Sequence, residues 1–350
     1  MSVNVNASRY QRWWVQQQSA LTSFNNSSGT WISNSSQLIR VDANSATATR
    51  DAPYSRFPVL TGTRSEVAGI RGRKRATWSI RGLPFIPSGT ATTAPDTDII
   101  LQNIFGQASS GTPRTYSFLD SGYLPFSMFQ FNQAFTTLTQ RALWGCFVTR
   151  VTWNFNGLFL TMDLDGFAGF EIDNQGFSSF PADGSLGGLT AFPVQPSSAP
   201  INGSPIPGFG NGYSLTLNSQ TFLLSVRALS CTLETGFTPL DDVYDSPFLA
   251  QVVGGARRFS INIGDILDSD VSTLTNLKEE CDTDLTGTGV TGTIVAGNAT
   301  GSTFTWTVNT IQPNAFDIRD NGAAVSFVLP SSYAHATAVG QTNDVSLSYS

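Results

Sequence analysis

The chain has 350 residues, a net charge of −6 and 13% charged residues, about half the usual share. Its length can bury a large core and favours two domains over one. Abundant Gly, Ser, Thr, Asn and Phe indicate a β-rich protein. Three scattered cysteines (Cys146, Cys231 and Cys281) exclude a disulfide framework or a zinc site. No signal peptide or membrane-length apolar run is visible, so a soluble protein made in a cytosol is expected.

The charges are unevenly distributed along the chain. Residues 1–150 hold 14 basic and 6 acidic residues, whereas residues 151–350 hold 5 basic and 19 acidic ones. Such a division favours head-to-tail association through surfaces of opposite sign. The alternative is a chance drift in composition that is spread over both surfaces.

Residues 1–55 form a polar N-terminal arm that contains the adjacent tryptophans Trp13 and Trp14. Two large aromatic side chains in a polar segment need an apolar surface to cover them. The arm packs either on its own chain or on a neighbouring subunit, and the sequence leaves both alternatives open.

A dense basic cluster follows, made of Arg71, Arg73, Lys74 and Arg75. It leads into a strand over residues 77–81, where Trp78 and Ile80 share one face. The cluster suits either nucleic-acid phosphates or an acidic neighbouring subunit. No aromatic residues are interleaved with it for base stacking, and most of the remaining chain is acidic.

A helix is predicted over residues 95–106. Pro95 occupies its first position, Asp96 and Asp98 its first turn, and Gly106 ends it. Its apolar residues recur at helical spacing and predict a stripe that covers one sheet.

Residues 151–164 predict a β-hairpin. Val151, Trp153 and Phe155 alternate with polar residues, and a second alternating run leads to Leu164. Asn156–Gly157 between them predicts a two-residue type I′ turn.

Between residues 181 and 212, 17 of 32 residues are Gly, Pro or Ser, which predicts a linker or a long surface loop. Strands are then expected over residues 222–234, 257–264, 303–309 and 323–329. A second, weaker helix is expected over residues 271–281.

Residues that carry chemistry are scarce. The only histidine, His335, has no partner at triad or metal spacing. Residues 287–292 match the glycine pattern of dinucleotide sites by letter but open no helix, so a loop is expected there. Asp265, Asp268 and Asp270 lack the spacing of a calcium loop. No catalytic residue, metal or cofactor is therefore predicted.

A unit appears twice along the chain. The first copy runs from Arg71 to Arg81 and then to the helix ending at Gly106; the second runs from Gly254 to Gly264 and on to Cys281. Each copy has a basic lead-in, an alternating strand and a short amphipathic helix. A duplicated unit without catalytic residues favours a structural building block.

Residues 56–81, 88–96 and 99–106 resemble tail tube (major tail) proteins of long-tailed bacteriophages. The shared features are an arginine-led strand, a small-residue loop that ends in Ala-Pro-Asp, and a helix that ends in Phe-Gly. Residues 230–236 and 254–258 resemble the strand–loop–arginine segment of the same family. The resemblance covers residues 55–170 and, more weakly, residues 215–350.

The resemblance implies two tail-tube-like β-sandwich domains, at residues 56–180 and 213–350, each flanked by a short helix. Strands of neighbouring subunits would close into a β-barrel. A chain with two copies would form a trimeric ring with pseudo-sixfold symmetry, and the rings would stack into a hollow tube. Phage double-stranded DNA would pass through the tube without specific binding.

The resemblance also implies a setting, namely a virion tail assembled in the host bacterial cytoplasm. The expected partners are other copies of the chain and the tape measure, terminator and distal tail proteins, with no membrane. Asp163 and Asp165 are candidates for an acidic lumen. The candidate contacts between rings or subunits are Trp13, Trp14, Arg71, Arg73, Lys74, Arg75, Arg257 and Arg258, together with loops 82–95 and 181–212.

Two other functions remain open from the sequence. A capsid decoration or tail-tip carbohydrate-binding β protein would share the composition but would not need a doubled unit. A polysaccharide-active enzyme would need paired acids, and Asp163 and Asp165 lie too close in sequence to serve well.

Overall fold

The computed structural model of the chain is mainly β, with long antiparallel strands and, in the described part, one short helix. The structure describes residues 11–18, 37–39, 45–51, 54–55, 70–71, 75–88, 92–106, 111, 113–120, 122–132, 140–155, 159–173, 205–206, 213–217, 220–222, 226–240, 251–267, 290–297, 302–312, 317–320, 325–334, 336 and 342–350.

The strands up to residue 173 are β1 (Gln11–Gln17), β2 (Gln37–Ile39), β3 (Ala46–Asp51), β4 (Tyr54–Ser55), β5 (Ile70–Arg71), β6 (Arg75–Pro84), β7 (Arg114–Ser117), β8 (Phe126–Asn132), β9 (Arg141–Asn154) and β10 (Thr161–Asp173). The helix α1 (Asp98–Phe105) lies between β6 and β7 along the chain. The later strands are β11 (Tyr213–Leu217), β12 (Gln220–Phe222), β13 (Val226–Glu234), β14 (Phe237–Leu240), β15 (Gln251–Gly254), β16 (Arg258–Leu267), β17 (Val290–Ala296), β18 (Phe304–Gln312), β19 (Asp317–Asp320), β20 (Val325–Ala334) and β21 (Val345–Tyr349).

Most of these strands belong to one antiparallel sheet, while β4–β5 and β14–β15 form separate two-stranded sheets. Through the middle of the large sheet the neighbours follow the order β3, β6, β10, β9, β13, β16, β20, β19. Among the described residues the pairings never return to their starting strand, and no closed barrel is found in that part of the chain. The expectation of a mainly β fold is confirmed.

The strands alternate apolar and polar side chains as the sequence predicts. In β6, Trp78 and Ile80 are buried, and in β18 Phe304, Trp306 and Val308 are buried, while their neighbours along each strand are more exposed. A strand that buries one face against a core requires this period of two.

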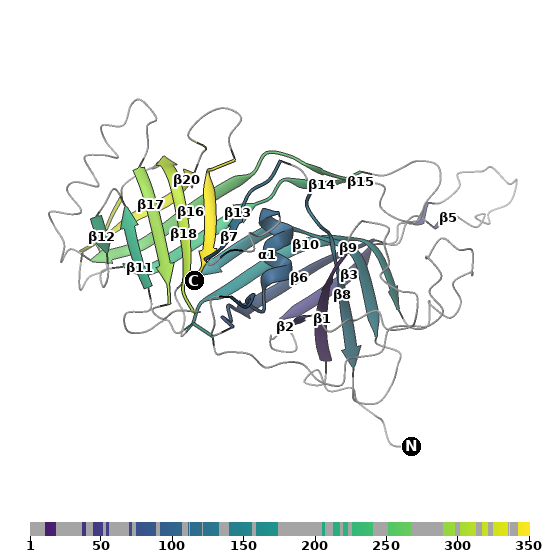
Figure 1. Cartoon of the computed structure of the whole chain (residues 1–350). Helices are drawn as coiled ribbons and strands as arrows, with labels where there is room; N and C mark the ends of the chain where they lie inside the picture. The colour runs from purple at the N-terminus through teal and green to yellow at the C-terminus, as the bar shows by residue number, and fades with distance from the viewer. Residues whose placement is uncertain are drawn as a thin grey trace, which may run out of the picture.

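The strand pairings of the first half recur in the second half. In the first half, β1 pairs with β2 and β8, β8 with β9, β9 with β10, β10 with β6, and β6 with β3. In the second half, β11 pairs with β12 and β17, β17 with β18, β18 and β19 with β20, β20 with β16, and β16 with β13. Figure 1 shows β11, β12 and β17 at one end of the molecule and β1, β2 and β8 at the other.

The register of these pairings also recurs. Asp51 lies opposite Arg75, and Glu234 lies opposite Arg258. The number of residues from Asp51 to Glu234 equals the number from Arg75 to Arg258, and we call this number the repeat interval. This repeat interval also relates the small sheets, since Tyr54 faces Arg71 and Phe237 faces Gly254. Irregularities coincide as well, because β8–β9 and β17–β18 each shift register directly after their first pair. The duplicated unit seen in the sequence therefore extends over nearly the whole strand arrangement.

The two halves share one sheet and one core. β9 of the first half pairs with β13 of the second, and β7 pairs with the C-terminal strand β21. Aromatic rings meet across the division, with Trp153 and Trp306 centroids 6.0 Å apart and Phe85 and Phe304 centroids 4.1 Å apart. The division into two domains stays a prediction, and the predicted linker lies almost wholly outside the described residues.

Helix α1 begins later than predicted, at Asp98. Residues before it form a turn in which the Asp98 N–H donates to the Pro95 carbonyl, so Pro95 precedes the helix. The helix ends at Gly106 as predicted, with a positive φ of 109°. A side chain at Gly106 would lie 2.7 Å from Leu119 Cδ1, which is a second reason for glycine there.

A buried polar network anchors α1. The Asp98 carboxylate accepts hydrogen bonds from Arg114 Nε (3.0 Å), Arg114 Nη2 (3.1 Å) and the Tyr116 hydroxyl (2.5 Å) of β7. Gln102 Nε2 also donates to Asp98, and Gln17 Nε2 of β1 donates to Gln102. These bonds fix the helix to β1 and β7, and nearly all its residues are buried.

The hairpin of β9 and β10 is confirmed, but its register does not fit the predicted two-residue turn. Asn154 pairs with Thr161, whereas a turn at Asn156–Gly157 would pair it with residue 159. The ends of the hairpin form hydrogen bonds elsewhere: the Phe155 N–H donates to the Leu229 carbonyl, and the Leu160 N–H donates to the Ile206 carbonyl. Residues 156–158, which hold the predicted turn, lie outside the described residues.

Three further expectations are corrected or fall outside the description. The strand expected over residues 222–234 is two strands, β12 and β13. The loop expected at residues 287–292 is partly strand, because β17 begins at Val290. The expected helix over 271–281, with Cys281, and the histidine His335 lie outside the described residues.

Candidate functional site

One face of the central sheet is polar from β6 to β16. Its side chains point away from the core because they alternate with buried residues along each strand. We call it the polar face; its residues are Thr77, Ser79 and Arg81 of β6, Asp163 and Asp165 of β10, Arg150, Thr152 and Asn154 of β9, Ser230, Thr232 and Glu234 of β13, and Arg258, Ser260 and Asn262 of β16.

Charges of opposite sign alternate across this face. Asp165 lies opposite Arg150, Arg150 lies opposite Glu234, and Glu234 lies opposite Arg258. Opposite charges at facing positions of neighbouring strands attract each other. The row crosses the junction between β9 and β13, so its charge pattern joins the two halves.

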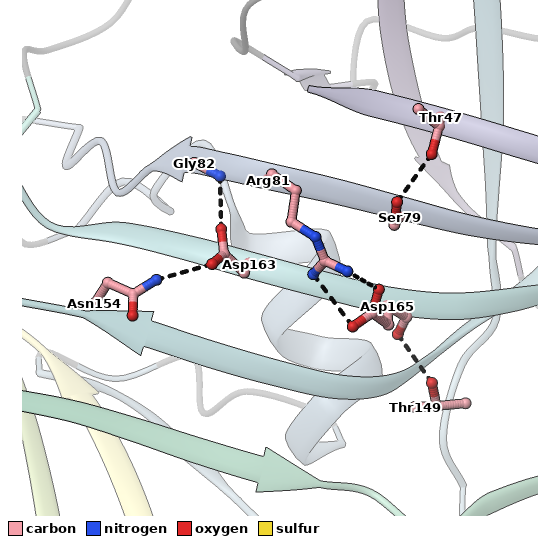
Figure 2. A network of polar contacts seen from close by, with 8 residues as sticks. All are labelled: Thr47, Ser79, Arg81, Gly82, Thr149, Asn154, Asp163 and Asp165. Carbon is pink, nitrogen blue, oxygen red and sulfur yellow. Dashed lines mark hydrogen bonds and ion pairs between the residues drawn. The ribbon is translucent and has the colours of Figure 1, made fainter. Parts of the chain in front are cut away.

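Asp165 forms an ion pair with Arg81 on the neighbouring strand. Both guanidinium nitrogens Nη1 and Nη2 of Arg81 donate to the carboxylate, as Figure 2 shows. The Thr149 hydroxyl donates to the Asp165 backbone carbonyl at 3.1 Å. The pair is partly exposed, so its contribution to stability is small.

Asp163 binds a bulge in β6 (Figure 2). Its Oδ1 accepts the Gly82 backbone N–H at 2.7 Å, and its Oδ2 accepts Asn154 Nδ2 at 3.0 Å. Gly82 has a φ of 64° where the register of β6 and β10 shifts, a conformation that favours glycine. Asp163 therefore fixes the local shape of the sheet.

These contacts change the expectation of an acidic surface. The structure brings Asp163 and Asp165 to one face, as the sequence predicted, but it also brings arginines beside them. The described charges of the polar face are balanced: the acids Asp163, Asp165 and Glu234 against the bases Arg81, Arg150 and Arg258.

Trp13 and Trp14 are buried within the chain itself. They lie in β1, between β2 and β8, and are 3% and 2% exposed. The arm thus packs on its own chain, the first of the two alternatives, and neither indole is available as an exposed contact.

The basic cluster is only partly described. Arg71 ends the short strand β5, and Arg75 begins β6 with a half-buried side chain opposite Asp51. Arg73 and Lys74 lie outside the described residues. A role for this cluster in subunit contact stays a prediction.

Arg257 connects the two halves. Its guanidinium lies 4.3 Å from the centre of the Phe118 ring, and its Nη2 lies 3.4 Å from Asp344 Oδ1. Burial raises the pKa of Asp344, and the charge of Arg257 opposes that rise. Arg257 is therefore an internal connection in this structure. Arg258 differs, because it is exposed on the polar face, 5.1 Å from the centre of the Tyr333 ring.

The central row of strands ends in two outer edges. In the described part of the chain β3 pairs with β6 alone and β19 with β20 alone. Because the Arg81 N–H donates to the Ser45 carbonyl, Ala46, Ala48 and Arg50 direct their backbone groups away from β6. Neither of these edges was predicted from the sequence.

Side chains guard the edge of β3. Arg141 Nη1 donates to the Ala48 carbonyl at 3.0 Å. Arg50 forms ion pairs with the buried carboxylate of Glu171 and with Asp173. Charged groups beside an edge strand hinder unwanted pairing with other chains.

The hairpin β14–β15 carries an exposed apolar patch. Leu240 is 44% exposed and Val253 is 40% exposed. Val253 faces Thr238, which shares a face of its strand with Leu240, so both apolar side chains lie on one face of the hairpin.

Compared with known proteins, the sequence matches no family and no curated protein. Within the residues described, no helix is long and apolar enough to cross a membrane. Nor do the described His, Cys, Asp and Glu residues gather in groups of three or more able to hold a metal ion.

Proposed function

We propose that this chain is a structural subunit that joins copies of itself into rings, which stack into a hollow tube for double-stranded DNA. The observation that carries the proposal is the repeated set of strand pairings, joined at β9–β13 and ending in the outer edges of β3 and β19. The first half of the chain already pairs with the second half, edge strand to edge strand. Another chain can extend this row of strands in the same way.

The resemblance to bacteriophage tail tube proteins gives this assembly its size and setting. Each half is then a tail-tube-like β-sandwich domain, and three chains supply the six units of a ring whose strands close into a barrel. The partners in this setting would be the tape measure, terminator and distal tail proteins.

The polar face is the surface that would line the channel. A protein grips DNA when unpaired lysines and arginines displace counterions from several phosphates. On the polar face Arg81 is paired with Asp165, and Arg150 lies between two acids. Such a lining carries little net positive charge, so the duplex can slide.

Electron microscopy and native mass spectrometry of the purified chain test the proposal. Rings or tubes are expected, with a ring mass three times the 37.5 kDa of the chain. A stable monomer at high concentration would overturn the proposal. A monomer that binds glycans would instead identify a carbohydrate-binding β protein.

DNA binding tests the channel lining separately. Assembled wild-type tubes are expected to release double-stranded DNA at moderate salt. The double variant Asp165→Asn/Glu234→Gln leaves arginines unmatched, and we expect it to retain DNA at low salt and lose it as salt rises. Asp120→Asn, at an exposed position outside the polar face, is the matched control and is expected to behave as wild type.

A further inference from the structure

The junction between β9 and β13 is a template for contact between chains. Asn154 lies opposite Ser230, Thr152 opposite Thr232, and Arg150 opposite Glu234. The hydroxyl oxygens of Thr152 and Thr232 are 3.1 Å apart, which shows how closely the facing side chains approach. Both strands also pair on their other sides, with β10 and β16 respectively.

The first half of this template is repeated by β3. Asp51 of β3 faces Arg75, the first residue of β6, and Glu234 of β13 faces Arg258, the first residue of β16, so Asp51 corresponds to Glu234. Position 49 therefore corresponds to position 232, and position 48 to Cys231. β3 and β13 also run in the same direction, because an even number of antiparallel steps separates them in the sheet. β13 has β9 on its outer side, whereas β3 has no described strand there.

The second half of the template is repeated by β18 and β19. Ala168 faces Ala76 and Ala334 faces Phe259, and the repeat interval relates Ala76 to Phe259, so Ala334 is the counterpart of Ala168. Ala168 also faces Cys146 and Ala334 faces Ile311, so Ile311 corresponds to Cys146. Met162 and Phe327 are counterparts in the same way, because Met162 faces Leu83 and Phe327 faces Ile266. Trp153 faces Met162 and Ile318 faces Phe327, so Ile318 corresponds to Trp153, at the same spacing that relates Cys146 to Ile311. Position 317 therefore corresponds to Thr152. β19 takes the place of the end of β9 that pairs with β13.

We propose that β19 of one copy pairs antiparallel with β3 of the next copy, with Ile318 opposite Ala48 and Asp317 opposite Thr49. This inference rests on the proposed function and specifies which strands join the subunits and in what register. The partner is a second copy of this chain, because the chain already contains the same junction between its own halves.

The edge of β3 is built for a strand to approach. Ala46 and Ala48 are small, and their outward backbone groups point away from β6. The Ala48 carbonyl is held by Arg141, a single side chain that an incoming strand can displace. Pairing with β19 would replace that bond by a ladder of backbone hydrogen bonds.

Cysteine cross-linking tests the register. Chains with Thr49→Cys and chains with Asp317→Cys are mixed, allowed to assemble and oxidised. Facing residues of neighbouring strands have the Cα separation that a disulfide requires. We expect a covalent dimer on a non-reducing gel, at least about ten times more abundant than with Thr47→Cys in place of Thr49→Cys. The wild-type chain, with its native cysteines, gives the background.

Two controls keep the result interpretable. The double variant Thr152→Cys/Thr232→Cys should form a disulfide within one chain, because it places cysteines at the template itself. A single chain with both Thr49→Cys and Asp317→Cys should give closed covalent trimers after assembly. Circular dichroism compares the fold of every variant with the wild type before mixing.

The outcomes separate this inference from the proposed function. Rings or tubes that assemble without the Thr49–Asp317 cross-link, or with an equal yield for Thr47→Cys, would overturn the strand pairing and leave the tube standing. Absence of both rings and cross-links would overturn both proposals. An open ladder of cross-linked chains would support the pairing and contradict the three-chain ring.

Discussion

The outer strand β3 and the junction strand β13 occupy the same place in the two halves but are built from different residues. Arg50 of β3 and Leu233 of β13 lie at corresponding positions, because Arg50 directly precedes Asp51 and Leu233 directly precedes its counterpart Glu234. Arg50 is paired with Glu171, whereas Leu233 is fully buried between Val151 and Phe259. The side chain at this position is thus charged in β3, which lies at an outer edge, and apolar in β13, which pairs with a strand on each side.

The strands that supply the next pairing differ in the same way. Arg141 of β9 corresponds to Trp306 of β18 by the spacing that relates Cys146 to Ile311. Arg141 donates to the edge of β3, while Trp306 is buried in the core. β9 is one strand of 14 residues with partners on both sides, whereas the positions that correspond to it lie in β18 and β19.

Replacing Leu233 at the β9–β13 junction by arginine, the residue at the corresponding edge position, should have the largest effect on stability. Leu233→Arg would bury an unpaired charge in the shared core, at a cost of about 4 kcal/mol in the free energy of unfolding. Insoluble or unfolded protein, seen by circular dichroism and chemical denaturation, is the expected result. Leu233→Met keeps the volume and is expected to cost less than about 1.5 kcal/mol. Equal stability of the two variants would show that β9–β13 is not sealed.

Removing the anchor of α1 should have the next largest effect. Asp98→Ala leaves the buried Tyr116 hydroxyl and the Arg114 guanidinium without their acceptor. We expect a loss of about 3 kcal/mol in chemical denaturation, because unpaired buried donors and charges are costly. Asp98→Asn keeps one acceptor oxygen and is expected to fall between wild type and Asp98→Ala. A loss below about 1 kcal/mol for Asp98→Ala would mean that apolar packing alone holds the helix.

Removing the Arg141 guanidinium from the edge of β3 should change the rate of assembly more than the stability of the chain. Arg141→Gln removes a partly exposed hydrogen bond to Ala48 and a long ion pair of 4.0 Å with Glu171, at a cost of about 1–2 kcal/mol. The free carbonyl can then accept a strand, so we expect assembly, followed by light scattering, to be several-fold faster. Arg150→Gln, on the polar face, is the matched control and should leave the rate of assembly nearly unchanged. Slower assembly of Arg141→Gln would show that Arg141 helps rather than hinders pairing.

Much of the fold follows from local patterns in the sequence. Alternation around Trp78, Trp153 and Trp306 predicts buried strand faces because side chains alternate sides whatever the strand pairs with. The end of α1 follows from Gly106, whose positive φ is a local property. The turn after β9 does not follow, since Phe155 and Leu160 bond to residues far away in the sequence.

Less of the candidate site than of the fold can be predicted from the sequence. Asp163 and Asp165 could be placed on one face, but their matching by Arg81 and Arg150 depends on which strands become neighbours. The same holds for Trp13 and Trp14, whose covering strands begin at residues 37 and 126. One signal for the outer edge does lie in the sequence: the repeat interval that relates the two basic lead-ins also relates Asp51 to Glu234.

The smallest effect concerns Arg257, whose corresponding position in the first half is Lys74. Only Arg257 is described in contact with the other half and with Asp344. Since burial raises the folded-state pKa of Asp344 above its ordinary value of 3.8, protonation favours the folded chain. The stability that this group contributes is therefore complete below about pH 3.8 and is lost as the pH rises through the raised value. Melting temperatures of wild type and Asp344→Asn, compared from about pH 3 upward, should show the wild type losing stability relative to the variant over this window. A difference that moves the other way would mean that the attraction of Arg257 outweighs burial.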